Sequence, residues 1–273
     1  MNALFILSPD SFPLIYGPDE QRDIGRSVTL LHPEAIPAES APTRTDLLAQ
    51  TDIIFSGWGG PLLDAAFMAA TPRLKAVFHG AGSIRHLVTD AFWDRNIPIT
   101  SSWAANAVPV AEFTLGEILL ALKRTWTYAF QIKTDKAYPR RYSVPGAYGS
   151  TVGIISLGMI GRRVCDHLRA FPDLKVIAYD PFATAGQAAQ LGVRLVDLDT
   201  LFREADVVSL HTPWLKETEG LITGAHFEAM KPGSTFINTA RGAVVREPEM
   251  IAVLQRRPDI TAFLDVTYPE PPA

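Results

Sequence analysis

The stretch TVGIISLGMIGRRVCDHLRAFPDLKVIAYD, from Thr151 to Asp180, decides the fold of this chain. An apolar strand over Val152–Ser156 leads into the glycine-bearing turn SLGMIG (residues 156–161), and a helical segment follows. A second apolar strand, Lys175–Tyr179, ends on Asp180. Strand, turn, helix, strand and terminal acid, in this order, are the layout of a βαβ unit that binds a dinucleotide.

Each part of this unit has a physical task. A pyrophosphate needs backbone N–H donors and the positive end of a helix dipole, and the helix that follows the turn supplies both. Gly158 would let the backbone approach the phosphates, and Gly161 would let the helix pack closely on the strand. Asp180 would accept hydrogen bonds from the adenosine ribose and repel a 2′-phosphate, so we expect NAD rather than NADP as cofactor.

One residue departs from the glycine-rich pattern, because Ser156 stands where the first glycine is usual. A Cβ at this position restricts the backbone conformations that the turn can adopt. We therefore expect Ser156 to affect how the turn binds the phosphates. Two glycines would also fit a tight turn that binds nothing. The flanking strands, the helix and Asp180 favour the dinucleotide site.

Composition limits the class of protein. The chain has 273 residues, enough for two domains, and 47% hydrophobic against 20% charged residues is typical of a globular protein. A net charge of -4 argues against a nucleic-acid partner, and we expect no apolar run to reach the ~20 residues of a membrane span. The N-terminus lacks a signal-peptide pattern, and the single cysteine, Cys165, cannot form an internal disulfide. We therefore expect a cytoplasmic protein without a metal site.

Strands and helices alternate on both sides of the turn, which predicts the α/β class with two doubly wound domains. The expected strands of the first domain are Ala3–Leu7, Ser27–Leu31, Asp52–Ser56, Lys75–His79 and Pro98–Ser101, with helices at Asp46–Gln50, Leu62–Ala70 and Thr89–Asp94. The second domain should hold six strands, at Thr151–Ser156, Lys175–Tyr179, Val193–Val196, Asp206–Leu210, Thr235–Asn238 and Ile260–Asp265. Its expected helices lie near Gln187–Leu191, Asp199–Glu204, Gly224–Met230 and Glu247–Arg256. We place the domains at residues 1–102 and 103–273, with the ligand site in the cleft between them.

A long apolar segment follows Pro109. It predicts a helix over Val110–Arg124 that is buried either against its own sheet alone or against its own sheet and a second subunit. The aromatic and basic connection Thr125–Gly149 comes next. It is either a packed surface loop or an arm across a dimer interface, since Tyr, Trp and Arg suit interface cores.

Four further segments follow strands at the edge where open α/β sheets bind ligands. After the fourth strand, HGAGS (residues 79–83) could form an anion nest for a carboxylate, or an ordinary turn. His211 is a hydrogen-bonded structural residue or a base. Arg241 could hold a 2-oxo acid by its carboxylate and polarise the carbonyl, or form a structural ion pair. The carboxylate of Asp265 or Glu270 could orient a histidine and raise its basicity; alternatively, the two residues form a solvated acidic turn.

Together with the turn, these segments resemble the D-2-hydroxyacid dehydrogenase family, which includes D-lactate, glycerate, phosphoglycerate, formate and phosphonate dehydrogenases. The resemblance rests on AANAVPVAEFTLGEILLALKR (104–124), TVGIISLGMIG (151–161), LHTPWLKETEGLIT (210–223), MKPGSTFINTARGAVV (230–245) and FLDVTYPEPPA (263–273). It implies a flavodoxin-like substrate domain, a Rossmann NAD-binding domain, and hydride transfer between NAD(H) and a small 2-oxo or 2-hydroxy acid. The homodimer that we expect rests instead on the apolar helix and the aromatic connection.

The resemblance also implies residue roles. Arg241 matches the arginine that binds substrate and polarises its carbonyl, Glu270 the acid that hydrogen-bonds the catalytic histidine, and Asp265 the acid near the nicotinamide carboxamide. The carboxylate-binding loop is matched by Ala81, Gly82 and Ser83. The residues against the pyrophosphate, adenosine and nicotinamide are matched by Met159, Ile160, His211, Thr212, Pro213, Thr239 and Ala240.

The family's catalytic histidine lies in a Pro-His motif beyond the position of Glu270, and this sequence ends at Ala273 before that motif. The family's C-terminal helices are not in the sequence either. Two expectations stay open: an NAD-dependent dehydrogenase given without its C-terminal end, or a catalytically silent NAD-binding sensor or scaffold of the same fold. Another Rossmann protein, such as a methyltransferase, would leave Arg241 and Glu270 without a purpose.

Overall fold

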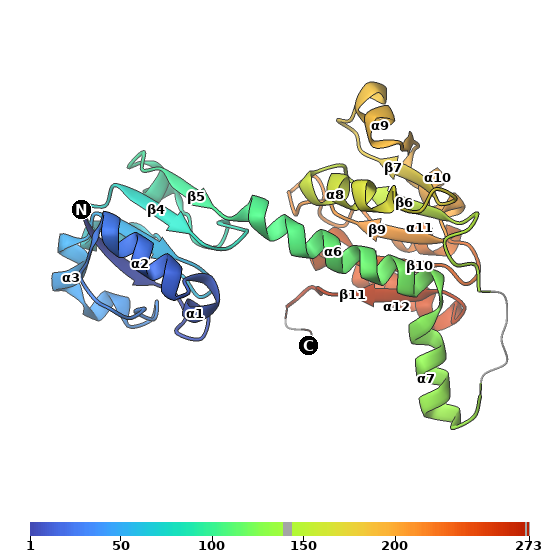
Figure 1. Ribbon diagram of the computed structural model, residues 1–273, viewed down its shortest axis with the longest axis horizontal. Helices are drawn as coiled ribbons and strands as arrows, with labels where there is room; N and C mark the ends of the chain where they lie inside the picture. The colour runs from blue at the N-terminus through green and yellow to red at the C-terminus, as the bar shows by residue number, and fades with distance from the viewer. Residues whose placement is uncertain (139–143, 271, 273) are drawn as a thin grey trace. The chain divides into compact units, whose positions relative to one another are not determined.

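The computed structural model describes residues 1–138, 144–270 and 272, and it divides the chain into two compact units, Met1–Asn106 and Ala107–Ala273. Each unit contains one parallel β-sheet with helices beside it (Figure 1). The fold class of two doubly wound α/β domains is therefore confirmed. Of the arm expected over Thr125–Gly149, residues 139–143 lie outside the described residues.

The first unit holds a five-stranded sheet. Its strands are β1 (Asn2–Ile6), β2 (Thr29–Leu30), β3 (Ile53–Ser56), β4 (Ala76–His79) and β5 (Ile99–Ser101), in the order β2-β1-β3-β4-β5. This is the order of flavodoxin-like sheets. Its helices are α1 (Phe12–Ile15), α2 (Pro18–Ser27), α3 (Thr45–Gln50), α4 (Ala65–Ala70) and α5 (Asp90–Trp93), with a 3-10 turn η1 (Ala41–Thr43). Alternate residues of β1 are buried on opposite faces, Leu4 and Ile6 on one and Phe5 on the other, because helices cover both faces.

The second unit holds a six-stranded sheet. Its strands are β6 (Thr151–Ile155), β7 (Lys175–Tyr179), β8 (Arg194–Leu195), β9 (Val207–Leu210), β10 (Thr235–Asn238) and β11 (Thr261–Leu264), in the order β11-β10-β9-β6-β7-β8. Counted from the first strand of this unit, the order is 6-5-4-1-2-3, which is that of a Rossmann fold. Beside the sheet lie α8 (Met159–Leu168), α9 (Ala185–Leu191), α10 (Leu198–Glu204), α11 (Gly224–Ala229), α12 (Glu247–Arg256) and the 3-10 turn η2 (Gly242–Val244).

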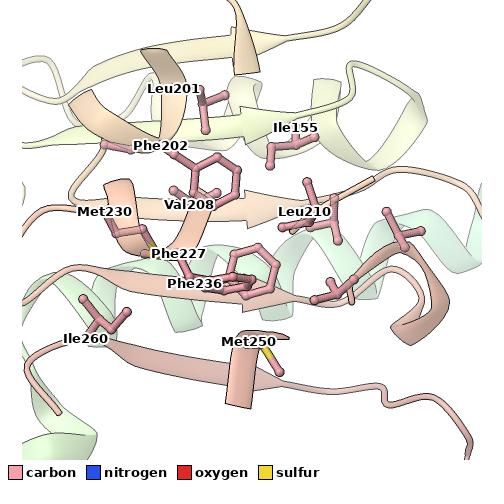
Figure 2. Close-up of a cluster of buried hydrophobic side chains, with 14 of the residues drawn as sticks. Ile155, Leu201, Phe202, Val208, Leu210, Phe227, Met230, Phe236, Met250 and Ile260 are labelled. Atoms are coloured by element: carbon pink, nitrogen blue, oxygen red, sulfur yellow. The ribbon is translucent and has the colours of Figure 1, made fainter. Parts of the chain in front are cut away.

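The main core of the second unit lies between the sheet and the helices α10, α11 and α12 (Figure 2). Phe227 and Phe236 pack edge to face, with ring centroids 4.9 Å apart, and Phe202 stacks beside Phe236. All three side chains are fully buried. Burial of these three rings stabilises the packing of α10 and α11 on the sheet. This packing fixes the positions of the strand ends of the sheet relative to one another.

The long helix α6 (Trp103–Leu122) differs from the expected one in its start and its burial. It begins before Pro109, which lies inside it, because the packing of Ala107 and Ala111 outweighs the hydrogen bond that proline cannot donate. Only one face is buried within the chain, and Phe113 is 42% exposed. Within the described residues, α6 is also the one helix long and apolar enough to cross a membrane, although core helices pass the same test. The expectation that no apolar run reaches that length is therefore wrong.

The connection after α6 begins as a helix rather than as a loop. Helix α7 (Thr125–Asp135) starts after Arg124, whose φ of 51° is left-handed and breaks the path of α6. The Glu117 carboxylate accepts a hydrogen bond from the Trp126 indole at 2.9 Å, which fixes the angle between the two helices. Helix α2 was not expected from the sequence either, because most of its ten residues are polar and none of them is buried.

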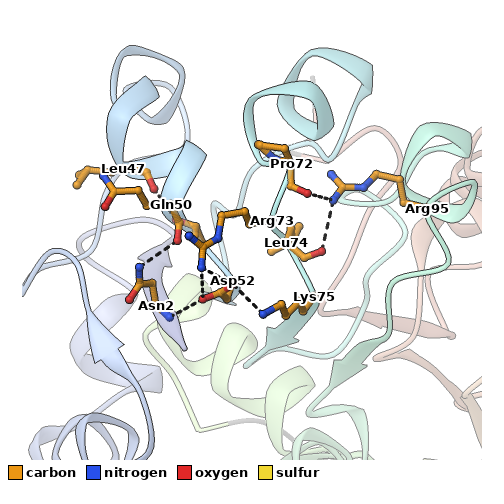
Figure 3. A network of polar contacts seen from close by, with 10 residues as sticks. Asn2, Leu47, Gln50, Asp52, Pro72, Arg73, Leu74, Lys75 and Arg95 are labelled. Carbon is orange, nitrogen blue, oxygen red and sulfur yellow. Dashed lines mark hydrogen bonds and ion pairs between the residues drawn. The ribbon is translucent and has the colours of Figure 1, made fainter.

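An aspartate closes the amino-terminal edge of the first sheet (Figure 3). Asp52, just before β3, accepts the Asn2 N–H at 2.8 Å and pairs with Lys75 at 3.1 Å and Arg73 at 3.4 Å. Its side chain is only 3% exposed. The second unit repeats the arrangement in part: Asp206, just before β9, accepts the Thr151 N–H at 2.7 Å and pairs with Lys231 at 3.1 Å.

Asp52→Asn is expected to lower the free energy of unfolding at pH 7 by about 1–3 kcal/mol, because it weakens a buried acceptor and removes its charge. The Asn2 N–H bond, aided by Lys75 and Arg73, lowers the pKa of Asp52 from 3.8 to about 2. The carboxylate therefore stabilises the fold above pH 4, and this contribution is lost as the pH falls toward 2. Urea unfolding of both proteins between pH 7 and pH 3 should show the difference shrink in acid, whereas Asp10→Asn at an exposed position should have little effect at any pH.

Candidate active site

The carboxyl ends of five neighbouring strands bring most of the expected site residues of the second unit to one edge of its sheet. In spatial order from β11 to β7, these ends carry Asp265, Thr239 to Arg241, His211, the turn at residues 156–161, and Asp180. Parallel strands of an open α/β sheet bind ligands at this edge.

The turn after β6 takes a conformation that suits glycine. Ser156, at the usual first glycine, has a φ of 78°, which is left-handed. Its N–H donates to the Tyr179 carbonyl at 2.8 Å and thereby joins the turn to β7. The turn thus has the glycine geometry but carries the steric cost of a Cβ.

Ser156→Gly is expected to raise the free energy of unfolding by about 1 kcal/mol. The substitution removes the left-handed strain of an L-residue, about 1–2 kcal/mol, and part of that gain is offset by the greater freedom of glycine in the unfolded chain. Urea unfolding of the two proteins measures the difference. A Ser156→Ala variant keeps the Cβ and serves as the control, so equal stabilisation by both changes would contradict the argument.

The two glycines of the turn face different surroundings. A Cβ on Gly161 would lie 2.1 Å from the Ser156 carbonyl oxygen, so this glycine is required for the turn to close on α8. A Cβ on Gly158 would meet no described atom within 4 Å. Gly158 is the N-cap of α8, and no described side chain caps that helix end. The N–H groups of the first turn, which include Met159 and Ile160, are therefore free to bind a pyrophosphate.

Asp180 binds the turn as well as standing at the end of β7. Its carboxylate accepts the Leu157 N–H at 2.7 Å through one oxygen and the N–H groups of Phe182 and Ala183, at 2.8 and 3.0 Å, through the other. The first oxygen keeps a lone pair for a ligand hydroxyl. The uncapped helix, the open approach at Gly158 and this carboxylate together fit the pyrophosphate and ribose of a dinucleotide.

His211 follows β9 and is 7% exposed. One ring nitrogen lies 3.0 Å from the Ser209 hydroxyl, while Nδ1 has no hydrogen-bond partner among the described residues. Burial lowers the pKa of His211 to about 4, so the ring is neutral at neutral pH. Thr212 beside it is buried, and the Pro213 carbonyl accepts the Thr218 hydroxyl at 2.6 Å. Residues 211–213 are thus better suited to lining a binding pocket than to donating a proton.

The turn that carries Arg241, residues 239–242, is held by hydrogen bonds that the sequence did not predict. Asn238, 1% exposed at the end of β10, accepts the Ala240 N–H at 3.0 Å and donates to the Arg241 carbonyl at 3.1 Å. Thr239 shares a hydrogen bond with Thr114 of α6 at 3.1 Å. Arg241 is exposed, and its guanidinium donates to the Ala240 carbonyl at 2.5 Å. The brace holds the arginine beside the strand ends while leaving most of its fork free.

Gly242 brings the Arg241 turn against the segment that leads to Glu270. A Cβ on Gly242 would lie 2.1 Å from the carbonyl carbon of Thr267, so only glycine allows this approach. The Glu247 carboxylate accepts the Tyr268 N–H at 2.7 Å and fixes the same segment from α12. Asp265 and Glu270 are exposed on it. The structure therefore links the Arg241 turn and the two acids through Gly242 and Glu247, neither of which was predicted.

The loop expected to bind a carboxylate follows β4 in the first unit. Ala81 is buried, Ser83 is exposed, and the Asn106 amide lies 3.3 Å from where a Cβ on Gly82 would be. His79 ends β4 and is 2% exposed, with neither ring nitrogen hydrogen-bonded among the described residues. Burial, with the nearby His86, lowers the pKa of His79 to about 4. His79 is therefore also neutral at neutral pH.

The part of the chain that the structure describes contains no group of three or more His, Cys, Asp or Glu side chains that could hold a metal ion.

Residues 115–273 match the family model described as D-isomer specific 2-hydroxyacid dehydrogenase, NAD binding domain. The chain belongs to the D-isomer-specific 2-hydroxyacid dehydrogenase family. The uncapped α8, Gly158 and Asp180 accordingly lie in an NAD-binding domain of this family, and NAD is its cofactor. The resemblance to this family stated from the sequence motifs is confirmed.

Named relatives agree with this assignment. D-3-phosphoglycerate dehydrogenase of Archaeoglobus fulgidus is 32% identical over 211 residues, which are 77% of this chain and 40% of the relative. The enzyme of that name from Mycobacterium leprae is 32% identical over 233 residues, or 84% of this chain and 44% of the relative. The chain thus spans less than half the length of these two dehydrogenases.

The solved structure of D-lactate dehydrogenase from Aquifex aeolicus, complexed with NAD and lactic acid, is also similar. It aligns with a TM-score of 0.77 and 27% identity, covering 98% of this chain and 78% of that one. The similarity includes the first unit, to which the family model does not extend.

Proposed function

We propose that this protein is an NAD-dependent dehydrogenase that transfers hydride between NAD(H) and a D-2-hydroxy acid or the corresponding 2-oxo acid. The observation that carries the proposal is the placement of Arg241 at the same sheet edge as the uncapped α8 and Asp180. A cation with a planar fork beside a dinucleotide site suits a substrate that bears a carboxylate next to a carbonyl.

In this proposal the N–H groups of Met159 and Ile160 hold the pyrophosphate and Asp180 accepts the ribose hydroxyls. NAD(H) supplies the hydride chemistry when bound. Arg241 binds the substrate carboxylate and stabilises negative charge on the carbonyl oxygen. The same carboxylate is bound by the loop Ala81, Gly82 and Ser83. The cofactor pockets are lined by His211, Thr212, Pro213, Thr239 and Ala240. Asp265 faces the nicotinamide carboxamide.

Glu270 would hydrogen-bond the histidine that donates the proton. Neither His79 nor His211 is assigned this task, because burial keeps both rings neutral at neutral pH. A second candidate is an NAD-binding sensor or scaffold of the same fold without turnover. NADH titration followed by assay against a panel of short 2-oxo acids separates the two. Turnover supports the dehydrogenase; NADH binding without turnover, in the chain and in a version extended with a Pro-His segment, supports the silent protein.

Asp180→Asn is expected to lower the preference for NAD over NADP, measured as the ratio of their dissociation constants, by about 10- to 100-fold. The reason is that the charge that repels the 2′-phosphate of NADP is lost. The asparagine keeps one carbonyl acceptor for the N–H groups that Asp180 binds now. Dissociation constants of both cofactors, measured by titration, give the ratio directly. Unchanged discrimination would assign Asp180 to the turn alone; Asp173→Asn at an exposed position serves as the control.

We also propose that the protein is a cytoplasmic homodimer. The exposed aromatic side chains Phe113, Trp126 and Phe130 on α6 and α7 support the dimer, since such side chains suit an interface core. Light scattering of the purified chain tests the assembly, and a mass near 29.9 kDa would contradict it.

A further inference from the structure

A hollow of about 630 Å³ lies at the amino-terminal edge of the second sheet, beside the first residues of β6 and β7 and the short strand β8. Four cationic side chains and one carboxylate line it: Lys175, Arg194, Arg203, Lys231 and Glu204. The candidate active site lies at the opposite ends of these strands, roughly 16 Å away along the five residues of β7. The hollow is therefore separate from the NAD site.

The hollow carries more positive charge than its own carboxylates neutralise. Arg194 pairs with Glu204, and Lys231 pairs with Asp206 at 3.1 Å. Among the described residues, the Lys175 ammonium has no carboxylate within ion-pair distance. Arg203 donates to the Thr200 hydroxyl at 3.0 Å and interacts with Asp197 only at longer range. Four cations and the two carboxylates of Glu204 and Asp206 leave an excess of about two positive charges at the hollow. The chain as a whole has a net charge of -4.

The amino-terminal edge of the first sheet differs in how its cations are paired. There, Asp52 draws both Arg73 and Lys75 onto one carboxylate, and the amino-terminal edge is closed. Among the described residues, the equivalent aspartate of the second unit, Asp206, forms an ion pair with Lys231 alone. Like charges held around one hollow repel each other, at a cost that a bound anion would remove.

We propose that this hollow binds a compact anion with at least two negative charges, either a phosphate-bearing small molecule or a polycarboxylate. Lys175 supplies a mobile point charge, while Arg194 and Arg203 supply planar forks that match phosphate or carboxylate oxygens. The site does not depend on the proposed dehydrogenase activity, because it uses none of the residues at the carboxyl edge.

The test is an amide NMR titration of the full chain with inorganic pyrophosphate and, separately, with citrate, at constant ionic strength. We expect saturable shifts at Thr151, Lys175 and Arg194. K175E and R203E should each weaken binding about tenfold or more, whereas K133E makes the same charge change at an exposed position of α7 and should not. Pyrophosphate binding alone would identify a phosphate-bearing ligand, and citrate binding alone a polycarboxylate.

Three results would overturn the proposal. The first is the absence of saturable shifts with either anion. The second is shifts confined to the amides of residues 157–161, which would mean that the glycine turn takes the anion. The third is an equal loss of affinity in K133E, which would show only a general effect of net charge. The amide spectrum away from the hollow shows whether K175E and R203E keep their fold.

Discussion

Replacing Arg241 with alanine is expected to lower kcat/KM for reduction of a 2-oxo acid by about a thousandfold, with the Kd for NADH changed by less than about threefold. In the proposed function, the guanidinium binds the substrate carboxylate and stabilises charge on the neighbouring carbonyl oxygen. Among the described residues, the guanidinium donates one hydrogen bond, to the Ala240 carbonyl, which leaves most of its donors for a ligand. Steady-state kinetics and NADH titration give the two quantities independently.

Arg241→Lys is the matched control, because it keeps the charge and loses the planar fork. We expect it to recover only part of the lost efficiency. If the chain shows no turnover, the same variants can be compared by the affinity of the NADH-bound protein for a 2-oxo acid. Parallel losses in substrate use and in NADH binding would mean that Arg241 holds the turn together, as its contact with Ala240 would allow, and the substrate role would be wrong.

Long apolar strands were predictable because their composition leaves few alternatives. β7 and β10 have the expected bounds, and the glycine turn with Asp180 identified the unit before any contact was known. Helices whose stability comes from tertiary contacts were less accessible. Pro109 suggested a helix start, yet the buried faces of Ala107 and Ala111 carry α6 through it. The left-handed Arg124, which separates α6 from α7, has no signal in the sequence.

The site shows the same division. Residues with a distinctive chemistry, such as Arg241 and Asp180, could be selected from their positions after strands. Those that hold them could not, because their role exists only through contacts that the path of the folded chain creates. Asn238 was within a quoted motif, but its two bonds across the Arg241 turn depend on the turn's path. Thr114 and Glu247 act over 125 and 21 residues of sequence, respectively.

The two glycines of the turn should respond in opposite ways to the same added methyl group. Gly161→Ala is expected to lower the free energy of unfolding by about 3 kcal/mol or more, because the new Cβ would lie 2.1 Å from the Ser156 carbonyl oxygen and 3.3 Å from an Ile154 methyl. A backbone oxygen cannot rotate away as a side chain can, so the turn itself must shift.

Gly158→Ala is expected to cost about 1 kcal/mol of stability or less, since its φ of -68° suits alanine and the Cβ meets no described atom within 4 Å. That same open space is where the pyrophosphate must approach the backbone. The Kd for NADH should therefore rise about tenfold or more. Urea unfolding and NADH titration of both variants give the four values. Normal NADH affinity in Gly158→Ala would place the pyrophosphate elsewhere, and normal stability in Gly161→Ala would mean that the turn can relax. The expected result is a loss of stability in Gly161→Ala and a loss of NADH affinity in Gly158→Ala. Only this combination agrees with a turn in which Gly158 serves the ligand and Gly161 serves the fold.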